Sequence, residues 1–257
     1  GVAKSVEIVT NTHLSLTGAS GKVGLYYDPD SSTWYLPMGT APSTHIVKQS
    51  HVRLDRIVLN EQLCLMTARK CGIAIPDSFI MNTGGGSESE VLLATARYDR
   101  ILPAETDAGY DRILPAKSGT IDGLRRPLRL HQEDFAQALG IPAIRKYERE
   151  EDHYLKKMFD LLRNYSADPI REQMKLWELI IFNYLIGNTD AHVKNFSVLY
   201  DPALRYVHLA PAYDLVSTMV YESSTRNMAF RIGGDLSLPD INRDSFRRAA
   251  SRSSFSF

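Results

Sequence analysis

The chain has 257 residues, 44% hydrophobic and 23% charged, which is the composition of a globular protein that can bury a core in one large domain or two lobes. Lys plus Arg and Asp plus Glu both number 30, so the formal net charge is zero. This balance gives no overall electrostatic reason to expect direct binding of nucleic acid or an anionic membrane.

The sequence predicts a cytoplasmic protein. No apolar run approaches the roughly 18 residues of a membrane span, and no signal-peptide segment opens the chain. Cys64 and Cys71 are seven residues apart in a helical pattern, which separates their Cα atoms by roughly 10 Å and excludes a disulfide between them. We therefore expect both to behave as small apolar side chains in a reducing compartment.

The first hundred residues predict a small sheet with one helix. The helix is expected from about Asp55 to Cys71, with Ile57, Leu63, Met66 and Ala68 near one side and Gly72 as its stop. A hairpin is expected around the loop NTGGGSESE. The β-type runs are residues 6–9, 23–27, 34–36 and 45–48, and the hairpin strands are residues 78–81 and 91–95.

Residues 98–130 have an irregular pattern and contain the heptapeptide YDRILPA twice, at 98–104 and 110–116. Seven identical residues do not recur by chance, so a twelve-residue unit is duplicated. The favoured interpretation is a lengthened surface loop, because loops tolerate insertion at a small entropic cost.

The chain from His131 onward is predicted to be mainly helical. HQEDFAQALG suits a helix that has acids in its first turn and ends at Gly140. The best-defined helix is 169–186, with Asp168 as N-cap, Pro169 in the first position and Gly187 as the stop. Its expected buried stripe is Ile170, Met174, Trp177, Ile181 and Tyr184. Residues 197–200 and 205–209 are expected to pair as a hairpin.

The decapeptide GNTDAHVKNF, residues 187–196, joins that helix to that hairpin. Its Asp190 and Asn195 have the offset of the catalytic Asp and the metal-binding Asn in the protein-kinase motif H-R-D-x-x-x-x-N. Asp214, in PAYDLVS, follows the hairpin, as the metal-binding Asp of D-F-G does. Phosphoryl transfer needs such a carboxylate to orient a hydroxyl and such oxygens to hold Mg²⁺.

Three features of the N-terminal half complete the pattern. Lys48 ends a β-type run, Glu61 lies in the next helix, and the Gly-rich segment SLTGASGKVG could hold phosphates through its backbone N–H groups. Each feature alone has an ordinary alternative, namely a solvated strand end, a surface charge and a hairpin connection. The ordered set favours a kinase.

Several stretches resemble the kinase core of the HipA-like serine/threonine toxin kinases. They are NTDAHVKNFSVLY…LAPAYDLVST, STHIVK, NEQLCLMTARKCGI, ARYDR, RLHQEDFAQALG with KYE, and MAFRIGG. The resemblance covers nearly the whole chain. It implies an α+β, bilobal protein-kinase-like fold, with a β-rich N-lobe at 1–97 and a hinge and helical C-lobe at 98–257.

The resemblance also implies roles for individual residues. Asp190 is the catalytic Asp, Asn195 and Asp214 are the Mg²⁺ ligands, and Lys48 binds the ATP phosphates with Glu61 as its partner. The remaining ATP contacts are Gly18, Ala19 and Ser20 in the Gly-rich loop and the hinge backbone at Ala96 and Tyr98, and the autophosphorylation candidates are Ser15 and Thr17. A phosphate on that loop would repel ATP or pull the loop away.

His192 stands two residues after Asp190, where ordinary protein kinases often place a Lys. It is either a donor to the transferred phosphate or a brace for Asp190, or else a histidine bonded to backbone. The chain also departs from common patterns. It has YDL in place of D-F-G and Ala96 in the hinge. It leaves no room for the usual N-terminal subdomain, which indicates the compact HipT-type branch or a trimmed chain, and its C-terminus is short.

The leading functional hypothesis is a Mg·ATP-dependent serine/threonine kinase that is the toxin of a bacterial toxin–antitoxin module. By resemblance its target is an aminoacyl-tRNA synthetase, its partners are a DNA-binding antitoxin and a small protein equivalent to the missing subdomain, and its Gly-rich loop is autophosphorylated. One alternative is a kinase-fold binding module with little or no phosphoryl transfer. A metal hydrolase built on Asp190, His192, His208 and Asp214 is disfavoured, because no H-E-x-x-H or comparable spacing occurs.

Overall fold

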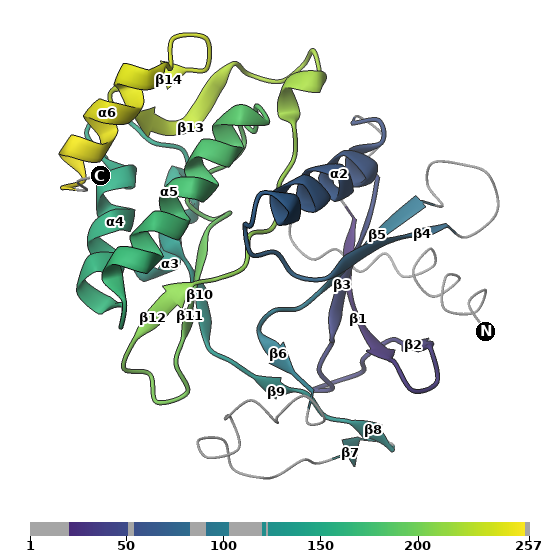
Figure 1. The fold of residues 1–257 in the computed structure, drawn as a ribbon. Helices are drawn as coiled ribbons and strands as arrows, with labels where there is room; N and C mark the ends of the chain where they lie inside the picture. Colours follow the sequence, from purple (N-terminus) through teal and green to yellow (C-terminus); the bar gives the residue numbers. More distant parts are fainter. Residues whose placement is uncertain (1–20, 51–53, 83–90, 103–119, 122, 255–257) are drawn as a thin grey trace. The chain divides into compact units, whose positions relative to one another are not determined.

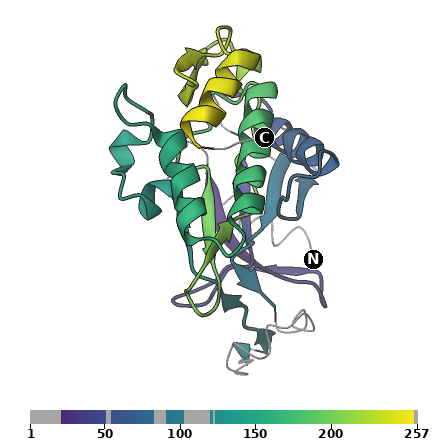
Figure 2. The ribbon, with the colours of Figure 1, turned by 60° about the vertical axis from the view of Figure 1, so that its left-hand side comes forward.

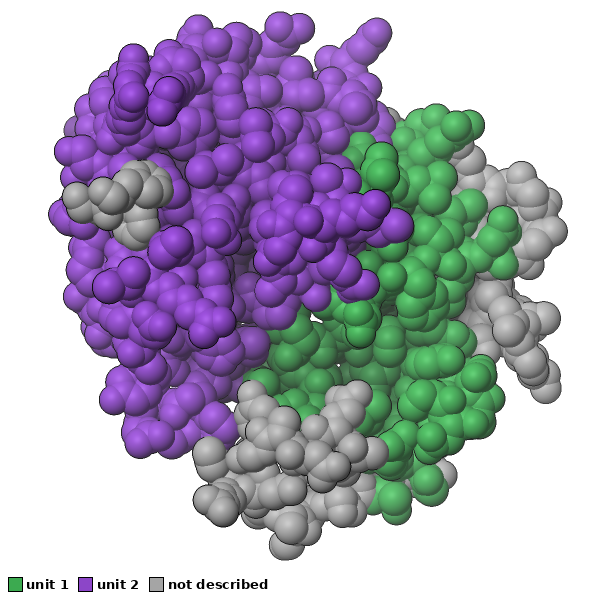
Figure 3. Space-filling view, in the orientation of Figure 1, with its two compact units in different colours: residues 1–63, 76–130 green, residues 64–75, 131–257 purple. Residues whose placement is uncertain are grey.

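The computed structural model describes residues 21–50, 54–82, 91–102, 120–121 and 123–254. The chain forms two compact units, which Figure 3 colours separately. Unit 1 contains residues 1–63 and 76–130, and unit 2 contains residues 64–75 and 131–257. The lobe boundary expected at residue 97 stays a prediction.

Unit 1 is built on a five-stranded antiparallel sheet in the order β2-β1-β3-β5-β4 (Figure 1). Every strand predicted between residues 23 and 95 is present, whereas the run at 6–9 lies outside the described residues. The strands are β1 (Lys22–Asp28), β2 (Thr33–Tyr35), β3 (His45–Gln49), β4 (Ser78–Asn82) and β5 (Val91–Ala96).

One face of this sheet carries an apolar cluster. Its buried members alternate along β1 and β5, as side chains on one face of a strand do, and Val47 of β3 joins them. The register of the strands brings these side chains together, because Val23 lies opposite Val47 and Val47 lies opposite Ala94. The cluster consists of Val23, Leu25, Val47, Leu92 and Ala94, with Trp34, Leu36 and Met81 packed against it.

Helix α2 (Ile57–Lys70) forms where a helix was expected and is followed by Gly72 at φ +81°, a backbone angle that favours glycine. Of the residues expected near one side, Ala68 is buried, whereas Leu63 is 66% exposed and Met66 is 51% exposed. The buried residues are Val58, Glu61, Cys64, Leu65 and Ala68. Apolar residues occur on both sides of this helix, so their pattern alone does not show which side is buried. Cys64 is buried, Cys71 is exposed and both are free thiols, as predicted.

Short strands occupy the described part of 98–130. They are β6 (Arg100–Ile101), β7 (Thr120–Ile121), β8 (Leu124–Arg125) and β9 (Leu128–Arg129), with β6 paired to β9 and β7 to β8. The first YDRILPA copy supplies β6 and the buried Asp99, whereas the second copy lies outside the described residues.

Unit 2 contains three longer helices, a small sheet in the order β10-β11-β12, and the hairpin β13-β14. Figures 1 and 2 show α4 and α5 side by side, and aromatic rings join them, because Phe159 of α4 meets Trp177 of α5 edge-on. Phe246 of α6 contacts Trp177 and Tyr184. The helices are α3 (Phe135–Ala138), α4 (Tyr154–Tyr165), α5 (Pro169–Leu185) and α6 (Arg243–Arg252), with 3-10 turns η4 (Ala143–Arg145) and η5 (Thr218–Val220); the strands are β10 (Gln132–Asp134), β11 (Ser197–Tyr200), β12 (Val207–Leu209), β13 (Asn227–Ile232) and β14 (Asp235–Ser237).

The helix expected from HQEDFAQALG is only one turn long. Gln132–Asp134 pair with β11 as strand β10, and the helix begins after Asp134, whose side chain caps it in a capping box with Gln137. The acids therefore precede the helix rather than lying in its first turn. Pairing with β11 decided the conformation of this segment, and that partner comes about 60 residues later.

The ends of α5 are as predicted, but its buried face is not. Asp168 accepts a hydrogen bond from the Arg171 N–H, and Pro169 opens the helix. Of the expected stripe, Trp177 is buried, whereas Ile170 is 72% exposed and Met174 48% exposed. The buried side chains are Glu172, Gln173, Leu176, Trp177, Leu179, Ile180, Phe182 and Asn183, since α5 packs on α4 and β12 along this face. Among the described residues, no helix is both long and apolar enough to cross a membrane.

Candidate functional site

In unit 1, β3 and α2 bring Lys48 and Glu61 together. Lys48 Nζ lies 2.6 Å from Glu61 Oε1, and both residues are buried. Hydrophobic side chains of similar volume often stabilise a fold as well as a buried ion pair does, because desolvating two charges is costly. The structure thus brings together the two residues that the sequence analysis paired, and their part in binding ATP stays a prediction.

The backbone expected to bind adenine follows β5. The Ala96 N–H donates to the Asp77 carbonyl and the Arg97 N–H to the Thr44 carbonyl, both at 2.8 Å. These two N–H groups are engaged within unit 1, so an adenine base would have to use other groups near Tyr98. Ser15, Thr17, Gly18, Ala19 and Ser20, the predicted loop residues, lie outside the described residues.

In unit 2, the loop 187–196 leaves α5 through Gly187 at φ +66°. A Cβ atom there would lie 2.8 Å from Met219 Cγ, so the position requires glycine for space as well as for its backbone angle. The Thr218 hydroxyl donates to the Gly187 carbonyl at 2.8 Å and accepts from the Thr189 N–H at 2.8 Å. These bonds to η5 fix the start of the loop.

Asn188 connects the loop to Asp214. Its Nδ2 group donates to Asn183 Oδ1 at 2.7 Å and to the Asp214 carbonyl at 3.3 Å. Asn183 and Asn188 are both 2% exposed, which makes this a buried link rather than a surface contact. Asp214 itself has φ +52°, a left-handed conformation that Asp adopts more readily than most residues.

The backbone carbonyl of Asp190 organises the middle of the loop. It accepts hydrogen bonds from the His192 N–H at 2.8 Å and from Asn195 Nδ2 at 2.9 Å. Because the Asn195 amide nitrogen is used here, its oxygen is the part of the side chain that can bind a cation. An Asn oxygen and the Asp214 carboxylate are ligands that suit Mg²⁺, which also keeps waters and phosphate oxygens.

The carboxylate of Asp190 is exposed and is contacted by a residue that sequence reasoning did not single out. The Tyr147 hydroxyl donates to Asp190 Oδ1 at 2.5 Å. Burial and this hydrogen bond both raise the pKa of Tyr147, so it is a neutral donor at ordinary pH. The only sequence signal was KYE, one of the stretches that carry the family resemblance.

His192 is 6% exposed, and its Nε2 lies 2.9 Å from Lys146 Nζ. A lysine ammonium can only donate, so Nε2 accepts and the ring proton is assigned to Nδ1. Burial lowers the pKa of His192, and nearby Asp190 partly opposes this shift. No hydrogen bond joins the His192 ring to the Asp190 carboxylate among the described residues, so the ring is not a hydrogen-bonded brace for it.

The second half of the loop is held by β10 and by the residue before Asp214. Lys194 Nζ lies 2.6 Å from Asp134 Oδ2. The Tyr213 hydroxyl donates to the Lys194 carbonyl at 2.9 Å and lies 2.6 Å from Ser197 Oγ. The charge of Lys194 is therefore paired with Asp134 and helps to hold the loop against β10.

The residues proposed for a metal hydrolase do not form a metal site. Within the described ranges, no group of three His, Cys, Asp or Glu side chains is placed to hold an ion. His208 lies in β12 opposite Leu199, and its pKa is lowered by burial while Glu172 opposes the shift. His208 therefore belongs to the contact between β12 and α5.

Solved structures define the class of fold. HipA of Shewanella oneidensis MR-1, solved in a complex with HipB and operator DNA, aligns with a TM-score of 0.77 at 24% identity, over 100% of this chain and 59% of that one. The Helicobacter pylori proinflammatory kinase CtkA aligns with a TM-score of 0.52 at 12% identity, over 90% and 81%. The fold is kinase-like, with mixed helix and strand, as predicted.

The chain belongs to the family of the HipA-like C-terminal domain, whose family model matches residues 14–255. It is 35% identical over 237 residues to the "Putative kinase Y4mE" of Sinorhizobium fredii, covering 92% of this chain and 50% of that protein. It is 29% identical over 230 residues to the serine/threonine-protein kinase toxin HipA of Shewanella oneidensis, covering 85% and 46%. The chain thus spans about half the length of these curated relatives.

Proposed function

We propose that this chain carries the catalytic machinery of a Mg·ATP-dependent serine/threonine protein kinase. The observation that supports this most is the arrangement of the loop 187–196. Asn195 bonds the Asp190 carbonyl and Asn188 bonds the Asp214 carbonyl, so a candidate base and two candidate metal ligands share one hydrogen-bonded frame. The names of the relatives add independent support for kinase activity.

Each residue has a defined part in this proposal. Asp190 orients the substrate hydroxyl and receives its proton, while Lys48, held by Glu61, binds the ATP phosphates. Asn195 and Asp214 would hold Mg²⁺, which when bound offsets negative charge on the phosphates. The backbone near Ala96 and Tyr98 would bind adenine, and the Gly-rich loop would bind phosphates and be modified at Ser15 or Thr17.

The biological context follows from the relatives rather than from the geometry. One relative is named a kinase toxin, and a solved relative is in a complex with HipB and operator DNA. We propose that this chain is likewise the toxin of a bacterial toxin–antitoxin module and acts in the cytoplasm. Its proposed target is an aminoacyl-tRNA synthetase, and its proposed partners are a DNA-binding antitoxin and a small protein equivalent to the N-terminal subdomain of HipA-type kinases.

The test is phosphate transfer from labelled ATP with Mg²⁺, with mass spectrometry of Ser15 and Thr17. Asp190→Asn should lower incorporation by about 10²–10⁴-fold, because the amide cannot take the hydroxyl proton. Asp201→Asn, a change to a surface carboxylate that binds β-turn N–H groups, is the control and should stay near wild type. Equal labelling of wild type and Asp190→Asn would remove Asp190 from this role.

A kinase-fold binding module with little turnover is the second candidate. The N–H groups of Ala96 and Arg97 favour it, because they already donate within unit 1. Fewer backbone groups then remain to hold adenine in the position that phosphate transfer requires. Thermal stabilisation by nucleotide without phosphate transfer to any protein would support this alternative.

A further inference from the structure

The dipeptide Lys146–Tyr147 lies against the candidate catalytic loop. Lys146 Nζ is 2.9 Å from His192 Nε2, and the Tyr147 hydroxyl is 2.5 Å from Asp190 Oδ1. The Tyr147 ring also meets the His192 ring edge-on at 5.5 Å between centroids, and Lys146 Nζ lies 4.9 Å from the Tyr147 centroid. Two successive residues thus contact the two titratable side chains of the sequence DAH.

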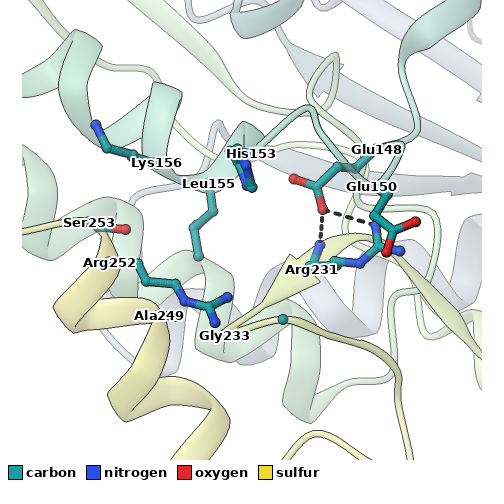
Figure 4. A pocket seen from close by; sticks show the side chains of 11 residues that line it. Glu148, Glu150, His153, Leu155, Lys156, Arg231, Gly233, Ala249, Arg252 and Ser253 are labelled. Carbon is teal, nitrogen blue, oxygen red and sulfur yellow. Dashed lines mark hydrogen bonds and ion pairs between the residues drawn. The ribbon is translucent and has the colours of Figure 1, made fainter.

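The residues on either side of the dipeptide are anchored. The Glu148 carboxylate accepts from the Arg231 N–H at 2.6 Å (Figure 4). It also accepts from the Tyr154 N–H at 2.7 Å, so it joins the start of α4 to β13. The Glu148 N–H donates to the Ala229 carbonyl at 2.8 Å. On the other side, the Tyr154 hydroxyl donates to the Arg145 carbonyl at 2.6 Å. The dipeptide is therefore a fixed part of unit 2.

Lys146 is half-buried, and no carboxylate lies within ion-pair distance of it among the described residues. Its contact, His192, is kept neutral by burial and cannot balance its charge. An ammonium that is held beside the candidate loop without a carboxylate partner keeps its charge available to an anionic ligand.

Phosphoryl transfer needs positive charge beside the transferred group, and the Lys146 ammonium lies next to the residue two positions after Asp190. During transfer the bond from γ-phosphorus to the ADP oxygen breaks and its electron pair stays on ADP. The substrate oxygen forms the new bond to phosphorus, and its proton passes to Asp190. The three non-bridging oxygens carry negative charge throughout, and catalysis depends on cations fixed beside them. At the second position after Asp190, where many protein kinases have a lysine, this chain has His192. Burial keeps that ring neutral, so it does not supply a positive charge.

We propose that Lys146 is a catalytic residue, whose ammonium contacts the phosphoryl group as it passes to a hydroxyl held by Asp190. This inference rests on the proposed kinase function. It adds a cation that comes from outside the catalytic loop, in the segment between η4 and α4. Tyr147 keeps the Asp190 carboxylate in place through Oδ1 and leaves Oδ2 for the substrate hydroxyl.

The test compares Lys146→Met and Lys146→Arg in the full chain with the control Lys156→Met. Lys156 is a lysine of the same unit that pairs with Asp160 on the surface of α4. Rates of phosphate incorporation from ATP are measured together with calorimetric affinities for Mg·ADP, with and without aluminium fluoride. Aluminium fluoride with ADP imitates the phosphoryl group in transit.

We expect Lys146→Met to lower the rate by about 10²–10³-fold, the loss typical of one fixed electrostatic contact to a transition state. The affinity of the variant for Mg·ADP should stay within about twofold of wild type. The increase in Mg·ADP affinity that aluminium fluoride causes in wild type should be absent from the variant. Lys146→Arg should recover part of the rate, and Lys156→Met should match wild type. A parallel fall in melting temperature and Mg·ADP affinity would show a structural role and overturn the proposal.

The outcomes separate this inference from the proposed function. An active wild type, an inactive Asp190→Asn and a fully active Lys146→Met would overturn the role of Lys146 alone. Equal labelling of wild type and Asp190→Asn would overturn the proposed function. In that case the affinities with aluminium fluoride still test the role of Lys146. If aluminium fluoride raises the Mg·ADP affinity equally in wild type and Lys146→Met, or in neither, Lys146 does not contact the phosphoryl group.

Discussion

Two residues next to each other in the chain, Lys146 and Tyr147, contact a loop that lies more than 40 residues further on. The Tyr147 contact is a hydrogen bond from a neutral phenol to a carboxylate, and such charge-assisted bonds are stronger than neutral ones. It fixes the orientation of the Asp190 side chain before any substrate arrives.

Tyr147→Phe should lower the rate constant for phosphate transfer about five- to tenfold, which corresponds to a loss of about 1 kcal/mol of positioning energy. The KM for ATP should be unchanged, because phenylalanine keeps the ring contact with His192. Steady-state kinetics at several ATP concentrations measure both values. A higher rate in the variant would contradict this expectation and show that Tyr147 blocks Asp190.

His45 predicts a pH dependence of stability in unit 1. Its ring lies among Tyr27, Trp34 and Phe79, and burial lowers its pKa from 6.5 to about 4. The unfolded chain therefore binds a proton below pH 6.5 that the folded chain binds only near pH 4. Stability is complete above pH 6.5 and falls between pH 6.5 and 4, by at most about 3 kcal/mol from this group.

The variant His45→Phe tests that dependence, because phenylalanine suits the aromatic surroundings and does not titrate. Urea unfolding at pH 7 and pH 4.5 should show a smaller loss of stability in the variant than in wild type. The hydrogen bond between His45 Nδ1 and Thr44 Oγ1 is absent in the variant at both pH values, so its loss cancels in the comparison. Equal losses would show that His45 titrates normally in the folded protein.

Helix α5 shows how one element supports the site. Its buried Glu172 accepts the Leu209 N–H of β12 at 2.6 Å and bonds Lys175 at 2.6 Å. Through β12 and its neighbour β11, which begins directly after the candidate loop, this carboxylate ties the helix before the loop to the sheet after it. A buried polar residue thus helps to hold α5 against β12.

Glu172→Ala should destabilise the protein by about 2–4 kcal/mol, because it leaves the buried Leu209 N–H without an acceptor. Glu172→Gln keeps an acceptor oxygen and should cost less, about 1 kcal/mol. Glu178→Ala on the exposed face of the same helix is the control, expected within about 0.5 kcal/mol of wild type. Urea denaturation measures all three, and equal effects of Glu172→Ala and Glu178→Ala would contradict the assignment.

At this scale the sequence predicted the elements well and their orientations poorly. The ends of α5 were predictable because Asp168, Pro169 and Gly187 act locally on the backbone. Its buried face was not, because Ile170 and Met174 are apolar residues on the outer side, and only the tertiary partners α4 and β12 determine which side is inner.

The same reason explains what was missed at the candidate site. Asp190, Asn195 and Asp214 were found because the order and spacing of chemical groups survive in a linear sequence. The contact of Tyr147 with Asp190 crosses 43 residues and depends on how the segment before α4 packs, so no local pattern revealed it. Glu148, which anchors that segment, is the last residue of KYE, but nothing in the sequence indicated its bonds to the Tyr154 and Arg231 N–H groups.

For the whole molecule, the proposed function assigns nucleotide-binding roles to residues of each unit. Lys48 and Glu61 belong to unit 1, whereas Asn195 and Asp214 belong to unit 2. A ligand that binds only the folded chain stabilises it by mass action, by about 2.7 kcal/mol at a concentration one hundred times its Kd.

Mg·ATP should therefore raise the melting temperature of wild type, and both Lys48→Met and Asp214→Asn should abolish the increase. Lys48→Met also removes the ion-pair contact with the buried Glu61, so each variant is compared with itself, with and without nucleotide. Lys70→Met, which removes an exposed charge at the end of α2, should retain the full increase. Loss in only one of the two variants would contradict a shared nucleotide.

The side-chain amide of Asn188 links the end of α5 to the backbone of Asp214. Because it bonds the last turns of α5 through Asn183 and the backbone of Asp214 at once, any displacement of that end of the helix carries both along. The decapeptide begins at the same point, so its aspartate travels with them. The distance between Asp190, the proposed proton acceptor, and Asp214, a proposed metal ligand, is therefore constrained by one shared hydrogen-bonded link.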